Sequence, residues 1–364
     1  MTDSAPPARV WLVLPGSLDA TTGGTIYDRR LVGALQGLGT QVEVVELAGG
    51  YPEPDPAARV AAAEAFARIP DGAVAAVDGL ALGALPEVAA AAATRLALVA
   101  LVHHPLGDET GIPDATRTRL LASERDALHH AHRVVVTSAF TRARLVDLGL
   151  VAQADGHVFV AEPGVDEAPL VPERSAGATW SLVSLGAVTP RKAHADALRA
   201  LDRVRDLDWT WTSIGRLDQD PRTAEEVMAL ARELELQDRV TFTGRLDTTA
   251  VEEHLGRAHL FLHPARYEGY GMAAAEALAR GLPVVASRGG ALAHTVPGGA
   301  GLLVEPGDVD ALAAALRGVM SGEVMSSDAT YARLRAGAAE ARAAQRGWDA
   351  TGRDFARALE GLAS

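Results

Sequence analysis

The chain has 364 residues, 48% of them hydrophobic, which is enough for about two domains with buried cores. It contains no cysteine, so disulfide scaffolds, thiolate zinc sites and cysteine nucleophiles are excluded. With 34 basic and 47 acidic residues, the net charge of -13 argues against nucleic acid or an anionic membrane as a partner. Residues 1–9 lack the features of a signal peptide, so we expect a cytoplasmic protein.

In the first half of the chain, short apolar runs alternate with longer segments of helical period, which predicts βαβ units around a parallel sheet. The longest apolar run, Leu96–Val102, is far shorter than the roughly 20 residues of a membrane span. The predicted strands are Val10–Pro15, Val42–Leu47, Val74–Val77, Leu96–His103, Val134–Thr137 and Val158–Ala161. The helices between them include Ile26–Leu38, Arg59–Ala67 and Arg117–His130.

A segment rich in proline, glycine and charge, Gly164–Ala178, then breaks this rhythm and is predicted to link two domains. A second α/β series follows it. Its predicted strands are Ser181–Leu185, Thr210–Ile214, Val240–Phe242, Leu260–Leu262, Pro283–Ala286 and Gly301–Val304. Its helices include Lys192–Val204, Thr223–Glu235, Ala273–Arg280 and Val309–Met320. We therefore expect an α/β chain with domains at 1–170 and 178–345, and a C-terminal helix at 346–364.

The most specific motif is RYEGYGMAAAEAL at Arg266–Leu278, directly after LFLHPA, the segment that contains the predicted strand Leu260–Leu262. Glycines around Tyr270 let the backbone approach a ligand, and the amides of a helix start are suited to a diphosphate. Glu268 and Glu276 flank this loop, and carboxylates accept hydrogen bonds from sugar hydroxyls. The alternative is a helix-start charge at Glu268 and a solvated Glu276.

The second motif, LGAVTPRKAH, is predicted to open a helix with Arg191 and Lys192. Lys192 is the only lysine in the chain. All other permanently positive side chains are arginines. Lys192 is therefore a candidate for a role that arginine cannot fill, one that needs a compact point charge, such as binding phosphate oxygens. The competing interpretations are a pyridoxal Schiff base and an accident of composition.

Two motifs in the first half follow predicted strands, where doubly wound domains bind ligands. Gly23 and Gly24 precede a helix, although a plain turn would also explain them. His103 and His104 stand before a proline, and either a structural or a functional role fits them. We interpret the cluster His129, His130 and His132 as the polar end of a helix rather than a metal site, since it lacks a partnered carboxylate.

Taken together, GG (23–24), HHP (103–105), EPGVD (162–166), PRK (190–192) and EGYGMAAAE (268–276) resemble the retaining glycosyltransferases of family 4 in order and spacing. The E-x7-E element is the most specific part. The resemblance implies the GT-B fold, in which two Rossmann-like doubly wound domains face each other across a cleft. It also implies an N-terminal acceptor domain, a C-terminal nucleotide-sugar domain, a C-terminal helix that packs back on the N-terminal domain, and no metal or other cofactor.

The resemblance further implies a role for each matching residue. Lys192 and Arg191 would hold the diphosphate and Glu276 the nucleotide ribose. Glu268 and the backbone of Gly269, Tyr270, Gly271 and Met272 would hold the donor sugar and phosphate, with Gly24 closing on the phosphate. His103 would contact the sugar, so that His103, Glu268 and Lys192 are the expected catalytic residues, with Gly23 and His104 as further candidates.

One position departs from the family, which often has an arginine after the glycine of the strand-end motif. Here Ala187 follows Gly186, and Arg191 or Arg216 is expected to supply the charge. Three Asp-x-Asp pairs, at 206/208, 218/220 and 308/310, are the residues that a metal-dependent transferase would use. In so acidic a chain we interpret them as chance pairs.

The expected activity is transfer of a sugar from a nucleotide diphosphate sugar, with a UDP-sugar favoured, to a hydroxyl acceptor with retention of configuration. A nucleotide-sugar epimerase of similar fold and a catalytically silent nucleotide-sugar binding protein are the alternatives. The predicted helix Ala57–Ala67 carries only Arg59 as a cation, which is too little for anionic membrane binding. We therefore expect a soluble small-molecule acceptor rather than a lipid or glycan.

Overall fold

The computed structural model describes residues 7–153, 156–321 and 327–362, which form two compact units. The first unit comprises residues 1–164 and 346–364, and the second comprises 165–345. The first unit thus ends at Gly164, six residues before the predicted boundary at 170, because Gly164 already packs against the backbone of Gly347 and Trp348. Among the described residues, no helix combines the length and apolarity needed to cross a bilayer.

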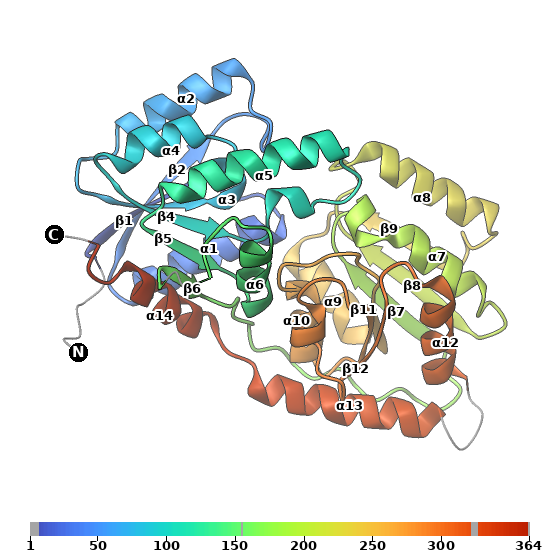
Figure 1. The fold of residues 1–364 in the computed structure, drawn as a ribbon. Coiled ribbons are helices and arrows are strands. Elements are labelled where there is room, and N and C mark those ends of the chain that lie inside the picture. The colour runs from blue at the N-terminus through green and yellow to red at the C-terminus, as the bar shows by residue number, and fades with distance from the viewer. Residues whose placement is uncertain (1–6, 154–155, 322–326, 363–364) are drawn as a thin grey trace. The chain divides into compact units, whose positions relative to one another are not determined.

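The first unit is built on a six-stranded parallel sheet in the order β2-β1-β3-β4-β5-β6 (Figure 1). Its strands are β1 (Arg9–Pro15), β2 (Gln41–Leu47), β3 (Val74–Asp78), β4 (Ala97–Val102), β5 (Arg133–Val136) and β6 (Val158–Val160). Its helices are α1 (Gly23–Gly37), α2 (Pro56–Ala67), α3 (Gly79–Leu82), α4 (Pro86–Ala93), η1 (Leu106–Asp108), α5 (Asp114–His129), α6 (Ala139–Asp147) and α14 (Trp348–Leu359).

The second unit repeats this plan with the sheet order β12-β11-β10-β7-β8-β9. Its strands are β7 (Trp180–Leu185), β8 (Trp209–Ile214), β9 (Val240–Gly244), β10 (Leu260–His263), β11 (Val284–Ser287) and β12 (Gly301–Val304). Its helices are η2 (Pro190–Lys192), α7 (His194–Asp202), α8 (Pro221–Glu233), α9 (Thr248–Arg257), α10 (Met272–Ala279), α11 (Leu292–Thr295), α12 (Val309–Met320) and α13 (Ser327–Ala344). The two sheets confirm the predicted pair of doubly wound α/β domains.

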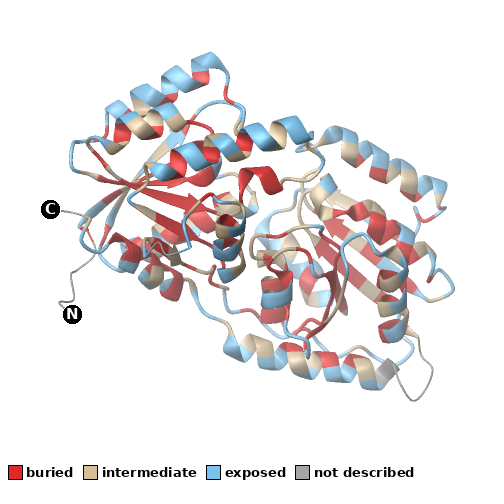
Figure 2. Ribbon diagram, in the orientation of Figure 1, coloured by how far each residue is buried: buried red, intermediate tan, exposed pale blue. Residues whose placement is uncertain are grey.

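Burial explains why the apolar runs form strands (Figure 2). In β10, Leu260 and Leu262 belong to one hydrophobic cluster and the intervening Phe261 to another. Alternate residues of a strand point to opposite faces, so this sheet is covered on both sides. All five residues of β3 are buried as well. Such strands read as continuous apolar runs rather than as an alternating pattern.

Helix α14 packs against α1 within the first unit. The ring of Trp348 meets Tyr27 edge-on at a centroid distance of 5.8 Å. Gly352 lies so close to Ala34 that a Cβ added to the glycine would come within 2.8 Å of the Ala34 Cβ. The hydroxyl of Thr351 donates a hydrogen bond to the Glu162 carbonyl at 2.7 Å. Small residues therefore bring the two helices into contact, although the far end of the chain supplies one of them.

The sheet orders identify the edges at which ligands are expected. In the first unit β2 lies on one side of β1 and β3 on the other, so the strand order reverses its direction at β1. In the second unit β8 lies on one side of β7 and β10 on the other, so the order reverses between the neighbouring strands β7 and β10. Doubly wound sheets bind ligands beyond the carboxyl ends of the strands at such switch points.

Candidate functional site

Three predicted residues of the second unit, Arg191, Lys192 and Glu268, lie in the two loops beyond its switch point. One loop follows β7 and carries Arg191 and Lys192, and the other follows β10 and carries Glu268. The main chains of the two loops are joined by a hydrogen bond from the Arg266 amide to the Arg191 carbonyl at 2.8 Å. Topology therefore brings together residues that are far apart in sequence.

The loop after β11 holds the backbone of Glu268 from behind. The Ala291 amide donates to the Glu268 carbonyl at 2.8 Å. Gly290 has a φ of +64°, and a Cβ there would come within 2.2 Å of that same carbonyl oxygen. Only glycine tolerates both the conformation and the close approach. These backbone contacts hold the Glu268 loop in addition to the contacts that its side chains make.

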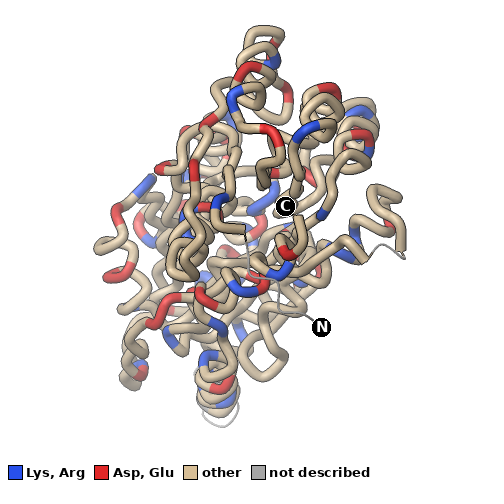
Figure 3. Tube along the Cα trace, turned by 90° about the vertical axis from the view of Figure 1, so that its left-hand side faces the viewer, with Lys and Arg blue, Asp and Glu red and all other residues tan. Residues whose placement is uncertain are grey.

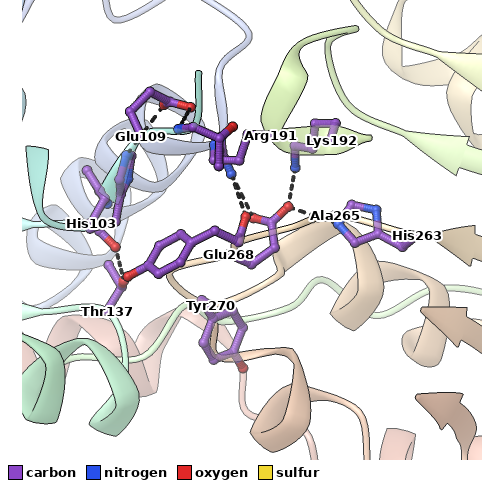
Figure 4. A network of polar contacts seen from close by, with 12 residues as sticks. His103, Glu109, Thr137, Arg191, Lys192, His263, Ala265, Glu268 and Tyr270 are labelled. Atoms are coloured by element: carbon purple, nitrogen blue, oxygen red, sulfur yellow. Dashed lines mark hydrogen bonds and ion pairs between the residues drawn. The ribbon is translucent and has the colours of Figure 1, made fainter. Parts of the chain in front are cut away.

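Three basic side chains surround the buried Glu268 carboxylate, as Figure 4 shows. The Lys192 ammonium donates a hydrogen bond to Oε1. His263 Nε2 lies 2.9 Å from the same oxygen. Arg191 Nη1 lies 3.5 Å from Oε2 and also donates to the Tyr267 carbonyl at 3.0 Å. The carboxylate and its partners form one charged network at the sheet edge.

Charge governs the protonation of this network. Burial acts to raise the pKa of Glu268, but Lys192, His263 and Arg191 outweigh it and hold that pKa well below its usual range. Burial is also the main reason that the pKa of His263 is lowered, with Lys192 acting in the same direction. At neutral pH the network therefore contains an ionised carboxylate beside a neutral imidazole and a lysine ammonium.

His263 was not among the predicted site residues. The signal that could have identified it is a polar residue at the carboxyl end of an otherwise apolar strand, LFLH. It is buried, with only 3% of its surface exposed. Its ring stacks on Phe261 at a centroid distance of 5.6 Å, which orients Nε2 toward the carboxylate.

The predicted start of the helix Lys192–Val204, which Arg191 and Lys192 were expected to open, is wrong. Pro190–Lys192 is a short 3-10 turn, and Ala193 adopts a left-handed conformation with a φ of +53° before α7 begins at His194. The left-handed residue interrupts the helical hydrogen bonds and turns the chain. The two cations consequently lie on a loop beside Glu268 rather than on the first turn of a helix.

Gly269, Tyr270, Gly271 and Met272 form the entry to α10. Gly271 is its N-cap with a φ of +99°, and among the described residues no side chain caps the helix. The amides of Ala274 and Ala275 donate to the Gly271 carbonyl at 3.0 and 3.1 Å, so Met272 and Ala273, which precede them, are the helix-start amides suited to an anion. Glu276 lies one further turn along α10, half-buried, and its carbonyl accepts from Arg280 at 3.1 Å. The predicted order of glycine loop, helix start and second glutamate is present.

The remaining charged candidates have structural partners. Arg216 forms a two-pronged ion pair with Asp218, at 2.9 and 3.2 Å. Asp220 and Asp308 cap α8 and α12 through their side chains. Hydrogen bonds from Arg317, Thr179 and Arg203 reach Asp206, Asp208 and Asp310, respectively. Each aspartate of the three Asp-x-Asp pairs therefore either caps a helix or pairs with an arginine or a threonine side chain.

In the first unit, the predicted residues gather beyond β1 and β4. His103, directly after β4, places Nε2 3.2 Å from the Asp28 carboxylate and 3.4 Å from that of Asp78. Gly24 lies in the first turn of α1, where an added Cβ would be 3.2 Å from the His103 ring. His104 instead approaches Glu109, at 3.8 Å. Neither Asp28 nor Asp78 was predicted from the sequence.

Gly23 opens α1, and a Cβ built on it would meet no atom within 4 Å. The two glycines therefore differ, since of the two only Gly24 is confined by a neighbouring side chain.

Acidic and basic residues are interspersed along the trace of both units (Figure 3).

Comparison with known proteins gives the second unit a family. Residues 172–340 match the model of the family "Glycosyl transferases group 1". Short segments also match two curated mannosyltransferases. The O-antigen chain mannosyltransferase B of Escherichia coli is 46% identical over 57 residues, and the MMP alpha-(1->4)-mannosyltransferase of Mycolicibacterium hassiacum is 47% identical over 64 residues. These segments span 16% and 17% of this chain but only 15% and 16% of the relatives.

Solved structures match nearly the whole chain. Sucrose-phosphate synthase from Thermosynechococcus elongatus has a TM-score of 0.79 at 22% identity, covering 96% of this chain and 98% of its own. Anabaena HepE in complex with UDP and glucose has a TM-score of 0.75 at 18% identity, with coverage of 96% and 99%. At these identities the likeness shows the fold, which is that of GT-B glycosyltransferases. The chain thus has a GT-B architecture, and residues 172–340 of it match the Glycosyl transferases group 1 model.

Proposed function

We propose that this protein is a retaining glycosyltransferase that moves a sugar from a nucleotide diphosphate sugar to a hydroxyl acceptor. The observation that carries the proposal is the Lys192–Glu268 pair beside the uncapped start of α10, at the switch point of a Glycosyl transferases group 1 domain. A cation and several amides at one sheet edge suit a diphosphate. A carboxylate beside them suits sugar hydroxyls.

In the proposed reaction, the bond between the sugar C1 and the diphosphate oxygen breaks and a bond from C1 to the acceptor oxygen forms on the same face. The acceptor proton passes to the leaving phosphate oxygen. Lys192, Arg191 and the amides of Gly271 and Met272 stabilise the charge that develops on the diphosphate, in the manner of an oxyanion hole. Glu268 orients the donor sugar, and Glu276 accepts hydrogen bonds from the ribose.

The donor and acceptor are narrower parts of the proposal. A UDP-sugar is favoured, supported by the similarity in fold to a protein solved with UDP and glucose. The two short matches are named mannosyltransferases, so mannose belongs in any donor panel beside glucose. We propose a small-molecule acceptor because Arg59, the one cation within α2, already donates to the Ala84 carbonyl at 3.1 Å. We also propose that transfer needs no metal, since Lys192 and Arg191 supply the positive charge that stabilises the leaving diphosphate.

The test is a panel of UDP-, GDP- and ADP-sugars read by thermal shift, followed by transfer assays and NMR of the product anomer. We expect one nucleotide to stabilise the wild type and Lys192→Ala to lose that shift. Arg222→Ala is the matched control, because Arg222 is 89% exposed and pairs only with its helical neighbour Glu226 among the described residues. Failure of every nucleotide sugar to bind, or an inverted product, would contradict the proposal.

Two further measurements separate the alternatives. An epimerase would convert the donor with no acceptor present, whereas a silent binding protein would show the thermal shift without turnover. Activity that survives a chelator supports metal independence, and loss of activity that a divalent cation restores would remove that part of the proposal.

A further inference from the structure

His103 lies between two buried carboxylates that come from different elements of the first unit. Asp28 is on α1, Asp78 is the last residue of β3, and their side chains are 1% and 7% exposed. Both carboxylates approach the same ring nitrogen, Nε2, at 3.2 and 3.4 Å. The His103 side chain itself is 18% exposed. One edge of the ring is therefore committed to the protein interior.

The two carboxylates are not equivalent. Asp78 caps α3 with Oδ1, which accepts from the Leu80 amide at 2.7 Å, and this leaves Oδ2 facing His103. Asp28 uses Oδ1 toward His103, while its buried Oδ2 has no hydrogen-bond partner among the described residues. An acid that faces only an imidazole and another acid is poorly compensated for burial unless the imidazole is charged.

Packing keeps the ring in this orientation. Tyr27 meets it edge-on at a centroid distance of 5.2 Å, and the Tyr27 hydroxyl donates to the Ala161 carbonyl at 2.8 Å. Gly24 closes the Cδ2–Nε2 edge. Tyr27 is the other titratable group at the ring, and it stays neutral because burial and the charges of Asp28 and Asp354 raise its pKa well above the ordinary value. The charge at this site is thus determined by His103, Asp28 and Asp78.

We propose that Asp28 and Asp78 are positioning residues that hold His103 as an imidazolium with Nε2 turned toward them, so that Nδ1–H is the donor His103 offers to a ligand oxygen. This rests on the proposed function, in which the ligand oxygen belongs to one of the two substrates of the transfer. An imidazolium donates hydrogen bonds and accepts none. His103 therefore binds a hydroxyl or phosphate oxygen and does not act as a general base, which agrees with a proton transfer from acceptor to leaving phosphate.

The electrostatics support the same protonation state. Burial lowers the pKa of His103, but Asp28 and Asp78 outweigh it and raise that pKa to about 10. Burial raises the pKa of Asp28 to about 7, although His103 opposes the shift. The pKa of Asp78 is lowered, since hydrogen bonds from His103 and the Leu80 amide overcome its burial. Asp28 is the largest contributor to the charge on His103, and it is the residue to neutralise first.

The direct test is NMR of the full chain with labelled histidine and no substrate, so that it does not depend on the proposed activity. The His103 resonance is assigned from its loss in His103→Gln. We expect wild-type His103 to remain an imidazolium up to about pH 9. Asp28→Asn should lower its pKa by about one unit or more, as expected when an opposite charge is removed. Titration of the wild-type ring between about pH 6 and 7, the range of an ordinary histidine, would overturn the proposal.

The second test is the pH dependence of kcat/KM for transfer. In Asp28→Asn and Asp78→Asn, the alkaline limb should move to lower pH, because His103 loses its proton sooner. The asparagine at 78 can still cap α3 through its amide oxygen, so the fold is retained. Asp108→Asn is the control, since Asp108 is equally buried in a pair with Arg144 at 2.7 Å but does not touch His103. If kcat/KM falls in these variants while the alkaline limb stays at the wild-type pH, Asp28 and Asp78 have only a structural role. That result would overturn the proposal.

The metal content of the purified protein distinguishes a proton on Nε2 from a metal ion at the same place. The three facing atoms of Asp28, Asp78 and His103 lie within 4.8 Å of one another, a separation that a divalent cation could also bridge. One metal ion per chain in the purified wild type, absent from Asp28→Asn, would mean that Nε2 binds a metal ion instead of carrying a proton. That result would overturn the proposal. Absence of metal together with a persistent imidazolium signal supports it.

Discussion

Lys192, the single lysine of the chain, donates a hydrogen bond to the buried carboxylate of Glu268, 76 residues further along the sequence. The pair joins the loops that follow β7 and β10, the two strands at the switch point of the second unit. A compact ammonium on a flexible stem can pair with a carboxylate and still reach a phosphate oxygen. The single lysine of an arginine-rich chain therefore contacts a buried carboxylate that His263 and Arg191 also approach.

Lys192→Ala is expected to lower kcat/KM by about 10²- to 10³-fold, the cost of removing one donor to developing negative charge. It also removes the largest single influence that lowers the pKa of Glu268. Circular dichroism should show an unchanged fold, and steady-state kinetics gives the rate. Arg222→Ala again serves as the surface control. Near-normal turnover in Lys192→Ala would mean that the lysine is an accident of composition.

Lys192→Arg is expected to restore little of that loss. A Cβ built on Gly186 would lie 3.2 Å from the Lys192 Cε, so the stem runs through a narrow space against the strand end. A planar guanidinium is broader than an ammonium and forms its hydrogen bonds in a fixed fork. The measurement is kcat/KM for the arginine and alanine variants side by side. Full activity in Lys192→Arg would show that only the charge matters.

Gly24→Ala is expected to lower activity by at most about 10-fold, less than the ~10²-fold cost of a 1 Å displacement of a positioned group. Its new Cβ would lie 3.2 Å from the His103 ring, which must move by a few tenths of an ångström to make room. Gly33→Ala on the same helix is the control, since a Cβ there meets nothing within 4 Å. That control should be as stable as the wild type or slightly more so, because alanine favours a helix. Equal activity in the two variants would mean that the reaction does not depend on this close contact between Gly24 and the His103 ring.

The sequence predicted the strands well for a physical reason. Both sheets are parallel and buried, so their strands appear as apolar runs such as VAAVD and LFLH. The position of the glycine loop at the start of a helix could also be predicted, because glycines followed by a run of helix-forming residues are visible within one segment. Its role as an anion site stays a prediction. These features depend on local chemistry that one segment of chain contains.

Other features depend on the fold and could not be predicted. Nothing about an alanine indicates that Ala193 turns left-handed and separates Lys192 from α7. Asp28 looks like an ordinary helical acid until α1 packs against the sheet and buries it beside His103. Asp78 does carry a signal in the sequence, namely a charged residue that ends an apolar run, here an entirely buried strand. His263 offered the same signal.

The second unit is expected to lose stability as the pH falls below neutrality, through His194. This side chain is 5% exposed, and burial, with smaller contributions from His263 and Lys192, lowers its pKa to about 3. The unfolded chain takes up a proton near 6.5 and the folded chain only near 3. The stabilising contribution is therefore complete above pH 6.5 and is lost progressively between these values.

His194→Gln should weaken this dependence, because the amide does not titrate. Hydrogen exchange of α7 peptides, compared between variant and wild type at each pH, measures the local stability. The control is His254→Gln, which replaces an exposed histidine on α9. An identical acid response in His194→Gln and the wild type would mean that His194 is not the group that titrates.

The first unit is expected to respond in the opposite direction, through Glu124 on α5. Glu124 is 1% exposed, and its Oε2 accepts from the Leu106 amide at 2.9 Å, while Oε1 has no hydrogen-bond partner among the described residues. Burial raises the pKa of Glu124 to about 8; the Leu106 amide opposes that shift and the charge of Asp108 adds to it. The folded state thus keeps a proton that the unfolded state releases near 4.5. Its stabilising contribution is complete below pH 4.5 and is lost as the pH rises toward 8.

Glu124→Gln should remove this loss, since a neutral amide can still accept from Leu106 and never ionises. At pH 8 the variant should protect α5 and the Leu106 turn from hydrogen exchange more strongly than the wild type does, whereas at pH 5 the two should be alike. Glu64→Gln, on the exposed face of α2, is the matched control. Greater protection of the wild type at pH 8 would show that the charged carboxylate is stabilised inside the unit. In that case the Leu106 amide would outweigh burial, and the sign of the pH dependence would reverse.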